Sequence, residues 1–92
     1  VLHSDKPVLL DFYADWCGPC KMLAPVVEDL GKKYEGKALI GKVDVDENQA
    51  LAGKYGVMSI PTVIFFKDGK EIGRKVGVQP ASVYTQTLDA NL

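Results

Sequence analysis

Trp16-Cys17-Gly18-Pro19-Cys20 is the stretch that decides the fold, and it contains the only two cysteines of the chain. The run Val8-Leu9-Leu10-Asp11-Phe12-Tyr13 precedes it, and its nearly continuous apolar character predicts a strand covered on both faces. The segment from about Pro19 to Tyr34 follows it and predicts a helix, with an apolar stripe at Leu23, Val26, Val27, Leu30 and Tyr34. The two cysteines are therefore expected at a strand-to-helix junction, in the first turn of the helix.

The spacing of the two cysteines indicates a bond that is made and broken. Side chains three residues apart on a helix share a face, so the sulfurs can bond with little backbone movement. The loop that they close is short, so the bond restrains the unfolded chain little. Cys17 is expected where unpaired N–H groups and the helix dipole stabilise a thiolate, which is the nucleophile. Pro19 suits the first helical turn, and Gly18 has no side chain to block a substrate.

A metal site is the alternative for two thiols. A structural zinc site needs about four ligands, and two cysteines with the single histidine, His3, do not supply a convincing set. No metal site is therefore predicted.

Asp11 is a charged residue inside a strand that is expected to be buried. Burial disfavours the carboxylate and raises its pKa, which suits an acid or base near neutrality. The alternatives are a structural, hydrogen-bonded aspartate or a strand at the sheet edge. Because side chains alternate along a strand, Asp11 shares a face with Leu9 and Tyr13, opposite Val8, Leu10 and Phe12. Tyr13 is interpreted as a packing residue.

The rest of the chain predicts further strands and helices in the order βα-βα-ββ-α. The expected elements are a strand over Ala38–Val45, a short helix capped by Asp46-Glu47-Asn48 and running through Tyr55, a strand over Thr62–Phe66, a tight turn at Lys67-Asp68-Gly69-Lys70, a charged antiparallel edge strand over Glu71–Val76, and a helix opened by Pro80 that carries Tyr84, Leu88 and Leu92. A strand, a helix and a second strand in succession suggest a parallel, right-handed crossover.

Size and composition predict a single domain over residues 1–92. The net charge of −1 gives no electrostatic case for nucleic acid or for an anionic membrane as partner. No apolar run approaches the ~20 residues that span a bilayer. A short secreted domain usually carries more cysteines, and no secretory signal is apparent, so a cytoplasmic protein is expected. A processed chain would also lack a signal.

Trp-Cys-Gly-Pro-Cys-Lys at 16–21, after a strand ending in Asp-Phe-Tyr-Ala at 11–14, resembles the thioredoxin family. The resemblance covers the whole chain and implies the thioredoxin fold, an α/β mixed sheet of about four strands with helices on both faces. It implies a thiol–disulfide oxidoreductase that reduces protein disulfides and carries electrons. Cys17 would attack and Cys20 would resolve the mixed disulfide. An NADPH-dependent thioredoxin reductase would be the electron-donating partner, and no cofactor is expected because the chain lacks a glycine-rich dinucleotide fingerprint.

The resemblance also assigns roles to residues outside the cysteine pair. Asp11 would accept the proton of Cys20 through a water molecule, and Lys42 would lie near this acid. The bond between Ile60 and Pro61 would be cis, with the Ile60 backbone free to pair with a substrate strand. The remaining assignments are Gly77 on the substrate surface, Trp16 as an apolar lid, and Met58 and Ser59 at the border of the substrate groove. The alternatives are an exposed strand lysine for Lys42, a turn proline for Pro61, a strand-end glycine for Gly77 and a core tryptophan for Trp16.

The family usually has one more strand and a helix before the position of Val1, and only the end of that helix could correspond to residues 1–3. Either the chain is a shortened variant or the segment lies outside the printed sequence. If the strand is absent, Ala38–Val45 becomes an exposed edge, and either lower stability or a dimer through this edge is expected.

Two other function classes stay open. An interaction module would use the surface around the cysteines and not the thiols themselves. An oxidant or isomerase is the third class, and the Gly-Pro dipeptide argues against it because such relatives typically carry a histidine between the cysteines.

Overall fold

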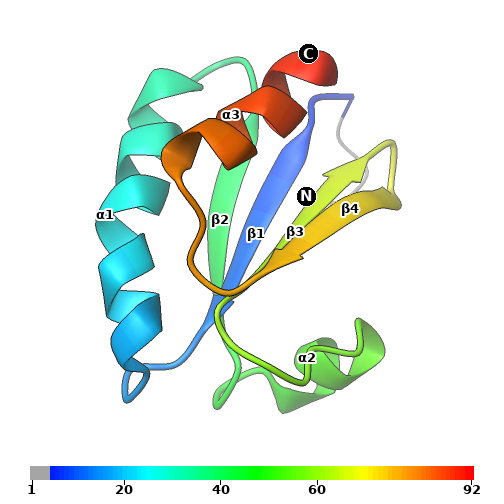
Figure 1. The fold of residues 1–92 in the computed structure, drawn as a ribbon. Helices are drawn as coiled ribbons and strands as arrows, with labels where there is room; N and C mark the ends of the chain where they lie inside the picture. Colours follow the sequence, from blue (N-terminus) through cyan, green and yellow to red (C-terminus); the bar gives the residue numbers. More distant parts are fainter. Residues whose placement is uncertain (1–4) are drawn as a thin grey trace.

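The computed structural model describes residues 5–92, in which strands and helices follow the predicted order (Figure 1). The observed elements are β1 (Val8–Tyr13), α1 (Gly18–Lys33), β2 (Leu39–Asp44), α2 (Gln49–Lys54), β3 (Thr62–Lys67), β4 (Lys70–Val76) and α3 (Ala81–Ala90). The expectations for residues 1–3, His3 included, lie outside the described residues. None of the described helices is long and apolar enough to cross a membrane.

The four described strands form one mixed sheet in the order β2-β1-β3-β4. β1 pairs with β2 in parallel and with β3 in antiparallel orientation, and β3 pairs with β4 in antiparallel orientation. The register places Asp11 of β1 directly beside Lys42 of β2. β1 is thus an inner strand, so the interpretation of Asp11 as an edge residue is wrong. β4 is an outer strand with a charged, largely exposed sequence, as predicted.

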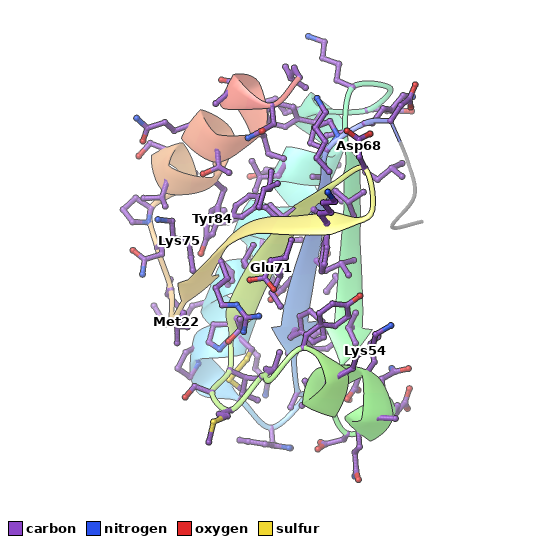
Figure 2. All side chains as sticks on the ribbon, turned by 90° about the vertical axis from the view of Figure 1, so that its right-hand side faces the viewer. Met22, Lys54, Asp68, Glu71, Lys75 and Tyr84 are labelled. Carbon is purple, nitrogen blue, oxygen red and sulfur yellow. A yellow bond between two sulfur atoms is a disulfide. The ribbon has the colours of Figure 1, made fainter. Side chains whose placement is uncertain are left out.

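Helices cover both faces of the sheet, which confirms the predicted layers. One buried cluster joins the sheet to α1 and α3, and it comprises Leu9, Leu23, Val27, Leu30, Tyr34, Ala38, Val63, Phe65, Tyr84 and Leu88. Tyr84 lies between α3 and the sheet (Figure 2). The opposite cluster joins the sheet to α2, and it comprises Val8, Leu10, Phe12, Val43, Ala52, Ile64 and Phe66. The predicted alternation of side chains along β1 is therefore confirmed.

α1 forms where the sequence predicts it because both of its ends carry suitable residues and one of its faces is apolar and buried. Cys17 is the N-cap, Pro19 lies in the first turn, and two lysines in the last turn complement the helix dipole. The predicted apolar stripe is buried at Leu23, Val27 and Leu30. Burying each such side chain contributes about 1.5–3 kcal/mol, so this face fixes the helix on the sheet.

One local prediction is wrong, and another is confirmed only in part. Leu92 does not belong to α3, which ends at Ala90, and its side chain is exposed. Asn91 ends this helix as its C-cap, with its side-chain amide donating to the Thr87 carbonyl. Asn48 is the N-cap of α2 but makes no side-chain cap bond, because its amide donates to the Asp44 carbonyl instead. Short polar side chains compete in this way for nearby backbone groups in turns.

Candidate active site

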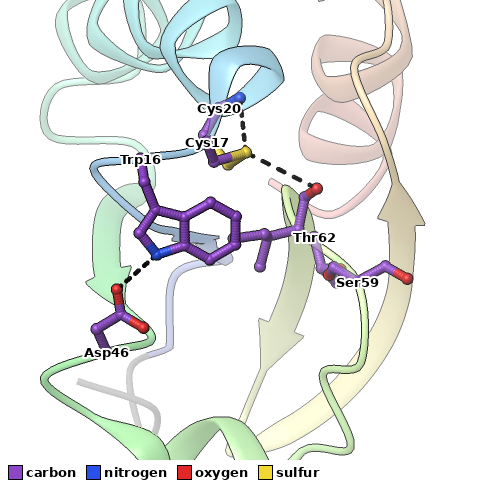
Figure 3. Close-up of a disulfide and its surroundings, with 7 residues drawn as sticks. Trp16, Cys17, Cys20, Asp46, Ser59 and Thr62 are labelled. Carbon is purple, nitrogen blue, oxygen red and sulfur yellow. Dashed lines mark hydrogen bonds between the residues drawn. A yellow bond between two sulfur atoms is a disulfide. The ribbon is translucent and has the colours of Figure 1, made fainter.

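Cys17 and Cys20 form a disulfide at the N-terminus of α1 (Figure 3). Their Cα atoms lie 5.2 Å apart. The backbone of Cys17 is extended, as an N-cap requires, and the backbone N–H of Cys20 donates to Cys17 Sγ at 3.2 Å. The Cys17 sulfur therefore occupies the acceptor position that a serine or aspartate oxygen fills in other helices. In the reduced protein the same N–H favours a thiolate at Cys17.

The segment before β3 lies against this disulfide. Cys17 Sγ is 3.9 Å from the Ile60 carbonyl oxygen, and Ile60 packs against the small cluster of Ala14, Cys17 and Cys20. The bond between Ile60 and Pro61 is cis, which confirms what the resemblance implies. The Gly77 N–H donates to the Pro61 carbonyl at 2.8 Å, so the end of β4 joins the same region. Gly77 has a φ of +82°, a backbone conformation that favours glycine.

Trp16 precedes Cys17 in the chain and is 70% exposed, so the interpretation of Trp16 as a core residue is wrong. Its indole N–H donates to Asp46 Oδ2 at 2.8 Å, a bond that the sequence reading does not anticipate (Figure 3). Met58 is 96% exposed, and a Cβ added at Gly18 would meet no atom within 4 Å. Next to Cys17 in the chain, the exposed indole of Trp16 is thus combined with open space at Gly18.

A cavity of about 140 Å³ connects Asp11 to Cys20. It is lined by Asp11, Tyr13, Ala14, Asp15, Cys20, Lys21, Ala24 and Lys42. A single water needs about 10–15 Å³, so the cavity has room for water between the carboxyl group and the sulfur. Cys17 does not belong to the lining, which distinguishes the environments of the two cysteines.

Asp11 is 1% exposed, and neither of its carboxyl oxygens has a hydrogen-bond partner in the described residues. The interpretation of Asp11 as a hydrogen-bonded structural aspartate is therefore not supported. Burial raises its pKa from the ordinary 3.8 to about 6, and the positive charge of Lys42 acts in the opposite direction. A carboxyl group with this pKa exchanges protons readily near neutral pH.

Lys42 is exposed to solvent and also lines the cavity. Its ammonium nitrogen lies 5.0 Å from the centre of the Tyr13 ring. Lys42 is thus both the exposed strand lysine of the alternative interpretation and a neighbour of the buried acid.

Several residues that line the cavity were not predicted from the sequence as site residues, and Tyr13 is the most informative of them. Its place on the same face of β1 as Asp11 is visible in the sequence, whereas its contact with Lys42 depends on the pairing of β1 with β2. Lys21 and Ala24 follow Cys20 by one and four residues on α1. Within residues 5–92, no group of three or more histidine, cysteine, aspartate or glutamate side chains is arranged to hold a metal ion.

A mixed sheet whose inner strand leads to a helix capped by a disulfide-forming Cys-x-x-Cys pair defines a thiol–disulfide oxidoreductase. Comparison with known proteins gives the family. The sequence profile described as "Thioredoxin" matches residues 1–90. The chain belongs to the thioredoxin family.

Individual relatives agree with the profile. A thioredoxin of Chlorobaculum thiosulfatiphilum is 50% identical over 92 residues, which are 100% of this chain and 85% of the relative. A thioredoxin of Staphylococcus aureus is 58% identical over 84 residues, which are 91% of this chain and 81% of the relative. Among solved structures, a mutant thioredoxin from Halobacterium salinarum NRC-1 superposes with a TM-score of 0.88 at 47% identity, covering 98% of this chain and 79% of the other.

The chain is accordingly a protein-disulfide reductase, and its predicted fold and enzyme class are confirmed. Its family implies disulfide-containing proteins as substrates and reductases as partners.

Proposed function

We propose that Cys17 attacks the substrate disulfide and that Cys20 resolves the resulting mixed disulfide. The observation that carries this assignment is the Cys20 N–H donated to Cys17 Sγ at 3.2 Å, which favours a thiolate at Cys17. In the first step the Cys17 thiolate forms a bond to one substrate sulfur. The substrate disulfide breaks, and its second sulfur leaves as a thiolate that takes a proton from solvent.

In the second step Cys20 loses its proton and attacks Cys17 Sγ. The Cys17–Cys20 disulfide forms, the bond between Cys17 and the substrate breaks, and the second substrate thiolate leaves. Two electrons have then passed from the dithiol to the substrate. The Cα separation of 5.2 Å lies within the range of ordinary disulfides, which supports closure without backbone movement.

Asp11 is proposed as the acceptor of the Cys20 proton, through water in the shared cavity. Its pKa of about 6 supports this role, because the group is mostly ionised at pH 7 and able to accept a proton. Lys42 is proposed to assist by favouring the ionised form of Asp11. The absence of Cys17 from the cavity lining supports a proton path that serves the resolving cysteine only.

The proposed substrate-binding residues surround Cys17. Trp16, Gly18 and Pro19 would contact the substrate from the side of α1, and Ile60, Pro61 and Gly77 from the side of β3 and β4. The contact of Cys17 Sγ with the Ile60 carbonyl at 3.9 Å supports a substrate strand that pairs with the Ile60 backbone next to the reacting sulfur.

Electron supply and location are further parts of the proposal. An NADPH-dependent thioredoxin reductase in the cytoplasm would return the disulfide to the dithiol, which makes the protein an electron carrier in cell redox homeostasis. A reduction assay with that reductase and NADPH tests the partner. If no strand precedes β1 in the protein, two copies are proposed to pair along β2, an outer strand of the described sheet, and sedimentation would show a dimer.

The reductase assay with insulin and a small dithiol is the primary test. Insulin reduction by the wild-type chain, absent in Cys17→Ser, is the expected result, and equal rates for both proteins would remove Cys17 from the mechanism. A binding role that survives the double change of both cysteines to serine would favour the interaction module. A redox potential nearer that of the strong oxidants, which lie about 150 mV above thioredoxin, would favour an oxidant.

A further inference from the structure

Tyr13 and Lys42 both line the cavity that Asp11 and Cys20 share, and the two side chains are in contact there. The Tyr13 ring lines the cavity, packs beside the cysteines, and has the Lys42 ammonium 5.0 Å from its centre. The Tyr13 carbonyl accepts the Val45 N–H at 2.8 Å, which fixes the backbone at the end of β1. The ring is therefore held in place by the sheet on one side and by the cysteine cluster on the other.

Several carboxylates lie close enough to Tyr13 to offer Lys42 other partners. The Lys42 side chain is long, exposed and flexible. Asp44 lies two residues further along β2, and the charges of Asp44, Asp15 and Glu47 all act on the Tyr13 ring. Nevertheless, no ion pair joins Lys42 to a carboxylate of residues 5–92. A lysine ammonium is attracted to the face of an aromatic ring, so the ring accounts for the position that Lys42 takes.

We propose that Tyr13 is a positioning residue, whose ring holds the Lys42 ammonium at the solvent side of the cavity so that its charge favours the ionised form of Asp11. The inference deepens the proposed function, because it rests on Asp11 serving Cys20. The ring acts only through Lys42, and the tyrosine hydroxyl takes no part.

The pKa of Asp11 and the pKa of Tyr13 both agree with this arrangement. The positive charge of Lys42 lowers the pKa of Asp11, against the larger effect of burial. Burial and the surrounding carboxylates raise the pKa of the Tyr13 hydroxyl, so this group stays neutral and does not exchange protons with Cys20 near pH 7. The groups that face Asp11 or the cavity are Tyr13 and Asp15 after β1, Lys42 on β2, Cys20 and Lys21 on α1, and Tyr84 on α3, which feels the Asp11 charge.

The test is a titration of the Asp11 carboxyl carbon by NMR in the oxidised protein and in matched variants. Lys42→Met removes the charge and is expected to raise the Asp11 midpoint by about half a pH unit, as for a partly exposed pair. Tyr13→Leu removes the ring and is expected to raise the midpoint by a similar amount. Tyr13→Phe keeps the ring without the hydroxyl and is expected to retain the wild-type midpoint.

The double variant Tyr13→Leu with Lys42→Met decides whether the ring acts through the lysine. Its midpoint is expected to equal that of Lys42→Met alone, since coupled residues give non-additive effects. The proposal is overturned if Tyr13→Leu leaves the midpoint unchanged, if its shift persists without Lys42, or if Tyr13→Phe shifts the midpoint as far. If Tyr13→Leu does not fold, the ε-methylene protons of Lys42 in the wild type decide, with ring-shifted signals supporting the contact and random-coil signals refuting it.

The titration also separates this inference from the proposed role of Asp11. If Asp11→Asn leaves the resolution rate and its pH profile unchanged, Asp11 is not the proton acceptor, although the Tyr13 and Lys42 effects on its midpoint would still be measured. If Asp11 is the acceptor, the pH profile of resolution in Tyr13→Leu is expected to move upward with the midpoint. An unmoved profile would refute the positioning role.

Discussion

On one face of β1, Val8, Leu10 and Phe12 enter a cluster built of apolar side chains from the sheet and α2. On the other face, Asp11 stands between Leu9 and Tyr13 with both carboxyl oxygens unpartnered in the described residues. The first face contributes stability through close packing. The second places an ionisable group beside a cavity, where packing is incomplete. One strand thus serves two purposes, and the alternation of side chains keeps them apart.

The face of β1 that carries Asp11 lowers the stability of the protein, and the pKa of Asp11 gives the size of this loss. Its pKa is raised from 3.8 to about 6, which corresponds to about 3 kcal/mol of lost stability wherever the group is ionised. The native state holds the proton more tightly than the unfolded chain does. Stability from this group therefore falls as the pH rises from about 4 to about 6, and above that range the loss is complete.

The largest expected effect is the loss of activity in Cys17→Ser, a substitution that lies outside both faces of β1. Cys17→Ser should lower insulin reduction by more than about a thousandfold, because the nucleophile is removed. The fold should persist, since serine is itself a favoured N-cap and can accept the Cys20 N–H. Insulin turbidity and circular dichroism measure the two properties. Cys20→Ser is the matched variant, and it should still attack but accumulate the mixed disulfide. Turnover in Cys17→Ser would contradict the assignment.

Phe12→Ala breaks the packed face. Phe12 is fully buried and makes an edge contact with Tyr55 at 6.4 Å between ring centres. The lost contacts and the cavity left behind should cost about 3–5 kcal/mol, measured by urea unfolding. Phe12→Leu is the control and should cost markedly less. A loss below about 1 kcal/mol for Phe12→Ala would mean that this face is not the stabilising one.

Asp11→Asn tests the face of β1 that carries the ionisable group. The substitution should raise the free energy of unfolding and lower the rate of substrate release. At pH 8 the gain should approach about 3 kcal/mol in urea unfolding of the oxidised form, reduced by what the buried amide costs. The gain should shrink as the pH falls from about 6 to about 4, where wild-type Asp11 is protonated in the native state. A gain that does not depend on pH would show that the charge is not its cause.

The same variant should slow substrate release from the mixed disulfide. Rapid-quench measurement of this step from pH 6 to 9 gives the rate and its pH dependence. Unchanged kinetics across this range would exclude Asp11 as the proton acceptor.

Gly77→Ala gives the smallest effect and lies outside both faces of β1. A Cβ there would meet no atom within 4 Å, so the cost comes only from the φ of +82° and should be about 1–2 kcal/mol. Gly53→Ala in α2 is the matched control, because its Cβ also meets nothing while its helical backbone favours alanine. Urea unfolding should show opposite signs for the two variants. Equal signs would mean that backbone conformation does not govern Gly77.

The sequence predicts the strands and helices well because their signals are local. Alternation along β1 and the stripe on α1 depend only on spacing within one element. Contacts between elements are not encoded in this way. The bond from Trp16 to Asp46 joins residues thirty positions apart, and the cavity depends on the register that puts Asp11 beside Lys42. The interpretation of Tyr13 as a packing residue misses this contact for the same reason, since the position of Tyr13 on the strand does not reveal that Lys42 lies over its ring.

The turn between β3 and β4 has a practical consequence. Asp68 and Gly69 both have positive φ, 54° and 80°, and form a two-residue hairpin turn. Val8, at the start of β1, pairs with Phe66 beside this turn, whereas Cys17 follows the far end of β1. Figure 2 shows Asp68 at the end of the molecule away from α2. A peptide tag inserted at this hairpin would attach the enzyme to a solid support with its disulfide facing the solution. The turn is therefore a suitable insertion site for an immobilisation tag.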